Sequence, residues 1–456
     1  MSTITTPVSL YRHENWSSRL AFILAATGSA VGLGNIWKFP YITGENGGGA
    51  FVLVYLACIA LIGLPIMMAE ILIGRRGQQS PIHSIAILAR QEGKSPVWQL
   101  VGWSGVLSAF IILSFYSVIA GWAVAYVFHA LGGAFHKATA DGIGNLFAAL
   151  LESPGQMVAW HTVFMVMTVL VVARGVKAGL ERAVSILMPA LFALLLILVG
   201  YAAVTTGKFG EGITFLFHMD FSQLSTEAVL TAMGHAFFTL SLGLGAMIAY
   251  GSYLPRHISI AKAALAISIV DTLVALLAGM AIFPIVFANH LEPGVGPGLI
   301  FQTLPLAFGQ MSGGLIFGTL FFVLLVCAAW SSSISLLEPV VEYLEEHHGV
   351  NRAVASLGAG VAAWLLGIAS ALSFNHWSEI TLFDKSLFDM LDYLTTNLML
   401  PLTGLLIAVF AGWVMTRAAT QEELEMGEGI GYRLWHFVVR YITPIGVTVV
   451  FAYNLL

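Results

Sequence analysis

The sequence predicts an all-α protein that crosses a membrane eleven times. Of its 456 residues, 58% are hydrophobic and 9% are charged, and the mean hydropathy is +0.88. Soluble domains carry roughly 25% charged residues, so this chain has too little polar surface to be one. A run of about 20 apolar residues is needed to cross the hydrocarbon of a bilayer. Such runs lie near residues 17–40, 50–73, 98–128, 157–173, 183–207, 228–251, 260–288, 314–346, 352–372, 389–416 and 433–454.

Charge and cysteine content exclude several other classes of protein. The net charge of −5 leaves no basic surface for nucleic acid. Cys58 and Cys327 both lie in apolar runs, and two such thiols make neither a disulfide framework nor a thiolate metal site. The sequence shows no Ser/His/Asp set, metal-ligand cluster or phosphate loop, so we do not expect an enzyme. The first apolar run has no small-residue cleavage site, so we expect residues 1–16 to be retained.

The positive charges predict the orientation of the chain. Lys and Arg collect in the cytoplasmic loops of membrane proteins. With the N-terminus inside, most of the 19 Lys and Arg residues fall on the cytoplasmic side, while Lys137, Lys208 and Lys385 fall outside. An odd number of spans then places the C-terminus outside. We expect a multi-pass protein of the plasma (inner) membrane.

The eighth apolar run is followed by acidic residues without a helix breaker. Nothing interrupts the pattern before Gly349, which is a typical helix end. We therefore expect the eighth helix to continue into an aqueous stretch that contains Glu342, Glu345 and Glu346.

Two of the predicted spans are interrupted by small residues. The first contains Gly28, Gly32 and Gly34 in mid-span, and the sixth contains Gly243 and Gly245. Taken alone, each segment would favour a structural interpretation, in which small residues allow membrane helices to pack closely. The two segments, however, open successive sets of five spans, and the second set is inverted because an odd number of spans separates their starts. Paired interruptions at corresponding positions indicate a transporter with its site at the bilayer midplane. The expected organisation is a cytoplasmic segment 1–16, a first repeat 17–207, an extracellular loop 208–227, a second repeat 228–416, a cytoplasmic loop 417–432 and an eleventh helix 433–456.

Three motifs resemble those of a known family. The first runs from Asn15-Trp16 through Gly28-Ser-Ala-Val-Gly-Leu-Gly-Asn35 to Pro40, followed by Glu45-Asn-Gly-Gly-Gly-Ala-Phe51. The others are Phe237-Phe-Thr-Leu-Ser-Leu-Gly243 and Ser331-Ser-Ser-Ile334. With these motifs the chain resembles the neurotransmitter:sodium symporter family over essentially its whole length, and it is most similar to bacterial eleven-span members that carry hydrophobic amino acids. The resemblance implies the leucine transporter-type fold, a 5+5 inverted repeat with broken helices 1 and 6, and sodium-driven symport.

The resemblance implies two sodium sites made of oxygen ligands, which suit a hard cation. The first would comprise the Ala30 carbonyl and the side chains of Asn35, Thr239 and Asp271, completed by the substrate's carboxylate. The second would comprise the carbonyls of Gly28, Val31 and Ala328 and the hydroxyls of Ser331 and Ser332. Consecutive serines in a membrane helix can instead bond to carbonyls of their own helix, and Ser333 has no implied role.

The resemblance also implies a substrate pocket with a polar and an apolar end. Backbone N–H groups near Leu33 and Gly34, with the Tyr116 hydroxyl, would bind a carboxylate. Carbonyls near Phe238 and Ser241 would accept from the α-amino group. Aromatic residues in apolar helices are more often ordinary core, so this assignment depends on the resemblance. The remaining lining would come from Ile112, Leu244, Ser332 and Leu336.

Charged residues at the ends of spans indicate gates. The resemblance implies an outer pair of Lys38 with Asp392, and Lys in place of the usual Arg predicts a looser pair. It implies an inner pair of Arg12 or His13 with Glu346, for which a solvated charge without a gating role is the alternative.

Three further polar residues lie within the predicted spans. The role of His235 is open, and a lone His in a helix is by default a satisfied polar group. We expect Glu70 and Glu338 to be hydrogen-bonded structural acids rather than ion ligands.

These features together predict a sodium-coupled symporter of a neutral, large hydrophobic or aromatic L-amino acid, independent of chloride. Asp271 and Ala275 occupy the positions where chloride-dependent relatives carry Asn and Ser, so the chain has a fixed negative charge and lacks a hydroxyl for the anion. A non-transporting amino acid sensor would use the same pocket, but the short cytoplasmic loops offer no signalling domain. A symporter of an amine or another small zwitterion is a further alternative. Amine carriers usually have an acid in the first span, where this chain has Ser29.

Overall fold

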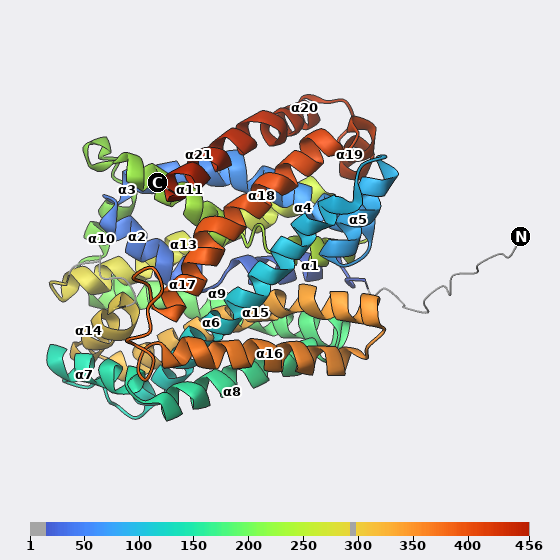
Figure 1. Ribbon diagram of the computed structural model, residues 1–456. Helices are drawn as coiled ribbons and strands as arrows, with labels where there is room; N and C mark the ends of the chain where they lie inside the picture. Colours follow the sequence, from blue (N-terminus) through green and yellow to red (C-terminus); the bar gives the residue numbers. More distant parts are fainter. Residues whose placement is uncertain (1–14, 292–297, 456) are drawn as a thin grey trace, which may run out of the picture.

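The computed structural model describes residues 15–291 and 298–455, which form a bundle of helices (Figure 1). In this part of the chain, nine helices are long and apolar enough to cross a membrane, and a bent pair makes a tenth span. The sixth predicted span is present as two shorter helices, so every predicted span has a helical counterpart. In order, the spans are α1 Arg19–Ala30 with η1 Gly34–Lys38 and α2 Phe39–Glu45; α3 Gly49–Cys58 to α4 Leu64–Gly77; α6 Gln99–Leu131; α8 Pro154–Val172; η4 Val176–Glu181 with α9 Arg182–Thr205; α11 Thr226–Thr239 with α12 Ala246–Ser252; α13 Ile260–Ala288; α15 Gly314–His348; α16 Arg352–Leu372; α17 Leu387–Tyr393 to η8 Phe410–Val414; and α20 Ile430–Phe437 to α21 Thr443–Leu455.

The first span breaks where the sequence predicts. α1 ends at Ala30, and the chain resumes as a helix at Gly34 with a bend of 53°. A Cβ at Gly32 would lie 2.5 Å from the Ser332 hydroxyl oxygen, so this turn of the break has room only for glycine. The last carbonyls of α1 therefore lose their helical partners and face α15.

The sixth span breaks between α11 and α12. Ser241, Gly243 and Gly245 have positive φ angles of 54°, 75° and 73°, which interrupt the helix. Glycine adopts this conformation without steric cost, and Ser241 is the non-glycine exception. The freed N–H of Gly243 donates to the Glu70 carboxylate over 2.7 Å. The break is thus built into the sequence and stabilised by a neighbouring span.

The short helix α12, which follows the second break, packs closely against the second span and the start of the first. A Cβ at Gly74 of α4 would collide with the carbonyl oxygen of Ile248 in α12, so the two backbones are in direct contact. Just before α1, the Trp16 indole donates to the Tyr250 carbonyl over 2.9 Å, and its ring packs edge-on against Tyr250. Parts of the first, second and sixth spans therefore form one packed unit.

The connecting helices separate onto the two ends of the bundle. α5 Pro81–Gln91 and α19 Arg417–Leu424 lie at one end, and α7 Ala140–Leu151, α10 Phe209–Phe217 and α14 Leu304–Gln310 lie at the other (Figure 1). This alternation is the one expected when successive spans cross the bundle in opposite directions. Large apolar side chains remain exposed around the outside, as expected of a surface that faces lipid; examples are Val163, Leu170, Leu196 and Leu365.

The eighth span confirms one expectation and corrects another. α15 continues to His348 and is capped by Gly349 at a φ of 62°, as predicted. Glu342, however, does not lie in an aqueous stretch. It is fully buried, and its carboxylate accepts a hydrogen bond of 2.8 Å from the Ser252 hydroxyl, because the end of α12 packs over this turn of α15.

Candidate substrate and cation sites

A cluster of three buried polar side chains lies beside both breaks. Asn35 follows the first break, Thr239 ends α11, and Asp271 lies midway along α13. The Asn35 amide nitrogen is 2.7 Å from Asp271 Oδ1 and 3.0 Å from Thr239 Oγ1, and the Thr239 hydroxyl is 3.1 Å from Asp271 Oδ2. The structure therefore brings together the three side chains predicted for the first cation site. Ala30, whose carbonyl completes the prediction, lines the same cavity as Thr239.

Within residues 15–291 and 298–455, the hydrogen-bond donors to the Asp271 carboxylate are the neutral side chains of Asn35 and Thr239. No ion pair within 4.0 Å joins it to a Lys, Arg or His in the described part of the chain. A buried carboxylate is costly without a positive partner and is stabilised by an adjacent cation. The cluster accordingly has the charge and the oxygen atoms to bind a small hard cation.

A second cluster joins the end of α1 to α15. The Ser332 hydroxyl oxygen is 3.4 Å from the Gly28 carbonyl, 3.2 Å from the Ser29 carbonyl and 3.4 Å from the Val31 carbonyl. The Ser331 hydroxyl donates to the Ala328 carbonyl over 3.0 Å. The five residues predicted for the second site are thus close together.

One detail of this cluster was not predicted, and another matches the alternative interpretation. The Ser29 carbonyl belongs to the group of oxygens around Ser332, although the sequence analysis did not include it. The Ser331 hydroxyl makes the bond to its own helix that was given as the alternative to a cation-ligand role. The Ser333 hydroxyl lies 2.7 Å from that of Thr168 in α8 and takes no part.

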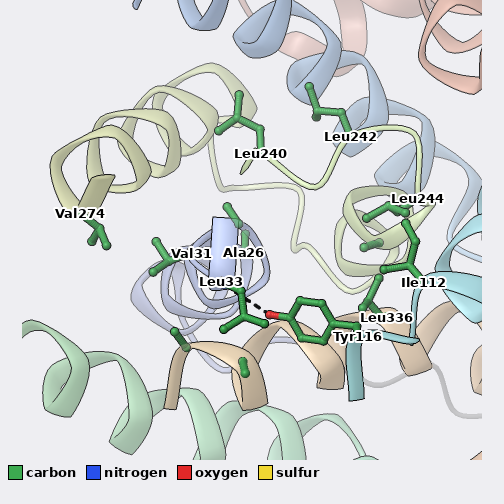
Figure 2. Packing of buried hydrophobic residues seen from close by; sticks show 14 of the residues in the cluster. Ala26, Val31, Leu33, Ile112, Tyr116, Leu240, Leu242, Leu244, Val274 and Leu336 are labelled. Carbon is green, nitrogen blue, oxygen red and sulfur yellow. Dashed lines mark hydrogen bonds between the residues drawn. The ribbon is translucent and has the colours of Figure 1, made fainter. Parts of the chain in front are cut away.

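A cavity of about 30 Å³ lies between the two clusters. Its polar end holds the Tyr116 hydroxyl, which accepts a hydrogen bond of 3.3 Å from the Leu33 N–H. Figure 2 shows Ile112, Leu244 and Leu336 gathered beside the Tyr116 ring, where they form the apolar end. A volume of this size admits little more than water, so an amino acid can enter only when the lining moves apart. All nine predicted pocket residues line it: Leu33, Gly34, Ile112, Tyr116, Phe238, Ser241, Leu244, Ser332 and Leu336.

The predicted outer gate has a different geometry from the expected ion pair. The Lys38 ammonium lies 4.6 Å above the centre of the Phe238 ring. No ion pair within 4.0 Å joins Lys38 to Asp392 among the described residues, and the Asp392 carboxylate accepts from the Thr396 hydroxyl over 3.1 Å. Lys38 therefore contacts an aromatic ring that also lines the cavity, in place of the expected carboxylate.

The predicted inner gate is described on one side only. Arg12 and His13 lie outside the described residues. The Glu346 carboxylate accepts from the Ser80 N–H over 2.8 and 3.0 Å and lies 3.1 Å from Nδ1 of His83, both at the start of α5. The sequence offered no signal for His83, because this contact joins two helices, α5 and α15, that are distant along the chain.

The remaining intramembrane polar residues fall into two groups. Glu70 bonds to the break of the sixth span as described, and Glu338 accepts from the Tyr253 hydroxyl over 2.8 Å and pairs with Arg352, in line with the expected structural role. His235 is not the satisfied polar group that was expected. It is buried against Tyr55, with ring centres 5.5 Å apart, and neither of its ring nitrogens has a hydrogen-bond partner in the described part of the chain.

The model of the Sodium:neurotransmitter symporter family matches residues 13–140 and 142–456 of the chain. The chain belongs to this family. The family is one of transporters, and the chain has the apolar helices of a multi-pass membrane protein. A Bacillus subtilis protein described as an uncharacterized sodium-dependent transporter, YhdH, is 38% identical over 439 residues, which cover 96% of each chain. The human sodium- and chloride-dependent GABA transporter 2 is 24% identical over 97% of this chain and 80% of its own length.

A solved structure confirms the fold. The crystal structure of MhsT in complex with L-phenylalanine has a TM-score of 0.89 to this chain and is 45% identical, covering 97% of this chain and 99% of that one. The chain therefore has the leucine transporter-type fold of a sodium-dependent symporter family, as the sequence motifs predicted.

Proposed function

We propose that this protein is a sodium-coupled symporter of neutral, large hydrophobic or aromatic L-amino acids that works by alternating access. The observation that carries the proposal is the cavity between two interrupted spans, which has one polar end, one apolar end and an oxygen cluster on either side. The structural relative holds L-phenylalanine, and the Bacillus relative is described as sodium-dependent.

The lining supports recognition of a zwitterion with a bulky side chain. A substrate carboxylate would replace the Leu33–Tyr116 hydrogen bond with bonds to both groups, since an anion is a better acceptor than a phenol oxygen. The α-amino group would donate to the backbone carbonyls near Phe238 and Ser241. Ile112, Leu244 and Leu336 present only apolar atoms to the side chain, which favours Leu, Phe and Trp over charged amino acids.

Two sodium ions would use the two oxygen clusters. At the first, the ion would bind the Asp271 carboxylate, the Thr239 hydroxyl and the Asn35 amide oxygen, together with the Ala30 carbonyl and the substrate carboxylate. This requires the Asn35 amide to turn, because its nitrogen faces Asp271 in the structure. At the second, the ion would bind carbonyls of Gly28, Val31 and Ala328 and the hydroxyls of Ser331 and Ser332. Oxygen-only ligand sets of this kind suit a hard monovalent cation.

We infer that transport needs no chloride. The human relative is named as chloride-dependent. In this chain, the buried Asp271 supplies a fixed negative charge beside the first cation, and the buried Ala275 one helical turn later offers no hydroxyl to an anion. Because the fixed carboxylate would already balance the positive charge of a bound sodium ion, chloride would not be needed beside it.

The proposal includes the orientation of the protein in the membrane and the two gates that close the cavity. The N-terminus would lie in the cytoplasm and the C-terminus outside the plasma (inner) membrane. The packed unit made of parts of the first, second and sixth spans would move relative to the rest of the bundle around the cavity. Lys38 with Phe238 and Asp392 would close the outer entrance, and Glu346 with Arg12 or His13 would close the inner one.

The test is uptake by the full-length protein in proteoliposomes. We expect labelled L-phenylalanine to accumulate only with an inward sodium gradient, and to do so equally in chloride and gluconate. Thermal unfolding with each of the twenty amino acids, in sodium and in potassium, identifies the preferred substrate because a ligand of the native state raises its stability. Sodium-dependent binding without uptake would favour the sensor, and stabilisation by amines alone would favour the amine carrier.

A further inference from the structure

A hydrogen bond between two side chains links the break of the first span to α15 next to the second cation cluster. The Ser29 hydroxyl donates to the Ser335 hydroxyl over 2.7 Å, and the Ser335 hydroxyl donates in turn to the Ser332 carbonyl over 2.8 Å. Ser29 and Ser335 are 2% and 1% exposed. We propose that Ser29 and Ser335 are positioning residues for the second sodium ion, an inference that rests on the proposed function.

Ser29 is in contact with α15 through both its side chain and its backbone. Its carbonyl accepts from the Ser332 hydroxyl over 3.2 Å and from the Ser241 hydroxyl, in the break of the sixth span, over 2.8 Å. The carbonyls of Gly28 and Val31 on either side face the same Ser332 oxygen. Because these carbonyls lie where α1 ends, their own helix does not fix them. A rotation of the peptide units at Ser29 would therefore move the predicted cation ligands.

The bridge uses no atom of the predicted ligand set. In the structure, the Ser332 hydroxyl bonds to the surrounding carbonyls. An arriving cation takes over those carbonyls and the oxygen of Ser332, so these hydrogen bonds end when it binds. The bond from Ser29 to Ser335 persists in both states and keeps the carbonyls aimed at the site. Ligands that are already in position bind more tightly, because less ordering accompanies binding.

The same geometry distinguishes this role from substrate recognition. Ser29 lines the cavity, but its hydroxyl proton is engaged by Ser335 and is not available to a substrate carboxylate. Loss of the bridge should therefore change the sodium requirement, while substrate affinity at saturating sodium should stay the same.

The experiment measures ²²Na⁺ binding to the purified full-length protein without any amino acid, in the variants Ser29→Ala, Ser335→Ala and the double variant. Loss of one buried hydrogen bond should raise the half-saturating sodium concentration about fivefold in each single variant. The double variant should match Ser335→Ala, because that single substitution already removes the bond that Ser29 makes.

Ser333→Ala is the matched control. It removes a buried serine hydroxyl from the same helix that bonds to Thr168 and not to α1, so sodium binding should change by less than about twofold. Ser335→Thr retains the hydroxyl and should restore sodium affinity. Thermal unfolding without sodium should show that Ser335→Ala and Ser333→Ala lower the stability of the protein by similar amounts.

The outcomes separate the two proposals. Single variants with unchanged sodium affinity, additive effects in the double variant, or an equal loss in Ser333→Ala would overturn the positioning role. Absence of ²²Na⁺ binding by the unmodified protein would instead contradict the proposed sodium symport.

Discussion

Asp271 lies in surroundings where acidic side chains are rarely found. It is fully buried, its partners are the neutral side chains of Asn35 and Thr239, and it lies beside the cavity that would receive substrate. An intramembrane acid that has no cationic partner and lies beside a cavity marks a candidate functional site, because its burial is otherwise costly.

Replacing Asp271 by Asn should weaken sodium binding about tenfold or more, because the ion loses a charged ligand. Adding Ala275→Ser should restore uptake only in chloride medium, since the new hydroxyl and the removed charge together make room for an anion. Sodium-driven uptake by reconstituted protein in chloride and in gluconate checks both statements. Chloride-dependent uptake by the unmodified protein would show that the carboxylate does not take the place of the anion.

Leu244 should set the size of side chain that the apolar end accepts. It is buried and lines the cavity beside Ile112 and Leu336, so Leu244→Phe would fill space otherwise available to the substrate. We expect binding of Trp to fall about tenfold, and binding of Leu to fall less, because overpacking costs about 1–3 kcal/mol. Competition against labelled Leu measures both, with Leu53→Phe on the exposed side of α3 as the control. Equal losses for Trp and Leu would argue against a size effect.

The breaks in the two interrupted helices could be predicted from the sequence, but the contacts at the gates could not. The glycines at 28, 32 and 34 and at 243 and 245 predicted the breaks because their effect is local: they allow positive φ angles or close approach. The contacts of the gates are not local. Lys38 lies on Phe238, and Glu346 meets α5, through the placement of helices that are distant along the chain. No spacing in the sequence encodes such partners, and the resemblance supplied residues for the gates but not these contacts.

The contact between α4 and α12 should tolerate no side chain at Gly74. A Cβ there would meet the Ile248 carbonyl, so Gly74→Ala should destabilise the protein by about 1–3 kcal/mol through overpacking. Gly200→Ala in α9 is the control, because a Cβ at Gly200 has nothing within 4 Å. Thermal unfolding of the two variants in detergent checks this. A Gly74→Ala protein as stable as Gly200→Ala would mean that the backbones separate without cost.

At the scale of the whole molecule, the two cation clusters and the cavity are parts of one arrangement. The first cluster shares Thr239 and Ala30 with the cavity, and the second shares Ser332. Binding of either the ion or the substrate would therefore fix the conformation of the same interrupted segments in the first and sixth spans. Coupling of this kind is reciprocal, since each ligand must change the affinity of the other by the same factor.

The reciprocity gives a quantitative expectation. Replacing sodium by potassium should weaken L-phenylalanine binding at least about tenfold, a coupling within the usual range of 1–3 kcal/mol. Asn35→Ala should raise the sodium concentration needed for half-maximal L-phenylalanine binding, because it removes a ligand that also orders the break. Isothermal titration of the purified protein in the two salts measures this. Identical L-phenylalanine affinities in sodium and potassium would rule out coupling through the shared residues.

The lone carboxylate of Asp271 also determines how the membrane voltage would act on the transport cycle. With two sodium ions and a zwitterion bound, an ionised Asp271 leaves the moving cavity with a single positive charge, and without ligands it leaves a single negative one. Each elementary charge that crosses 100 mV is worth about 2.3 kcal/mol. The electrical driving force would then be divided between the inward step of the loaded carrier and the return of the empty one, whereas a neutral residue at this position would place all of it on the loaded step.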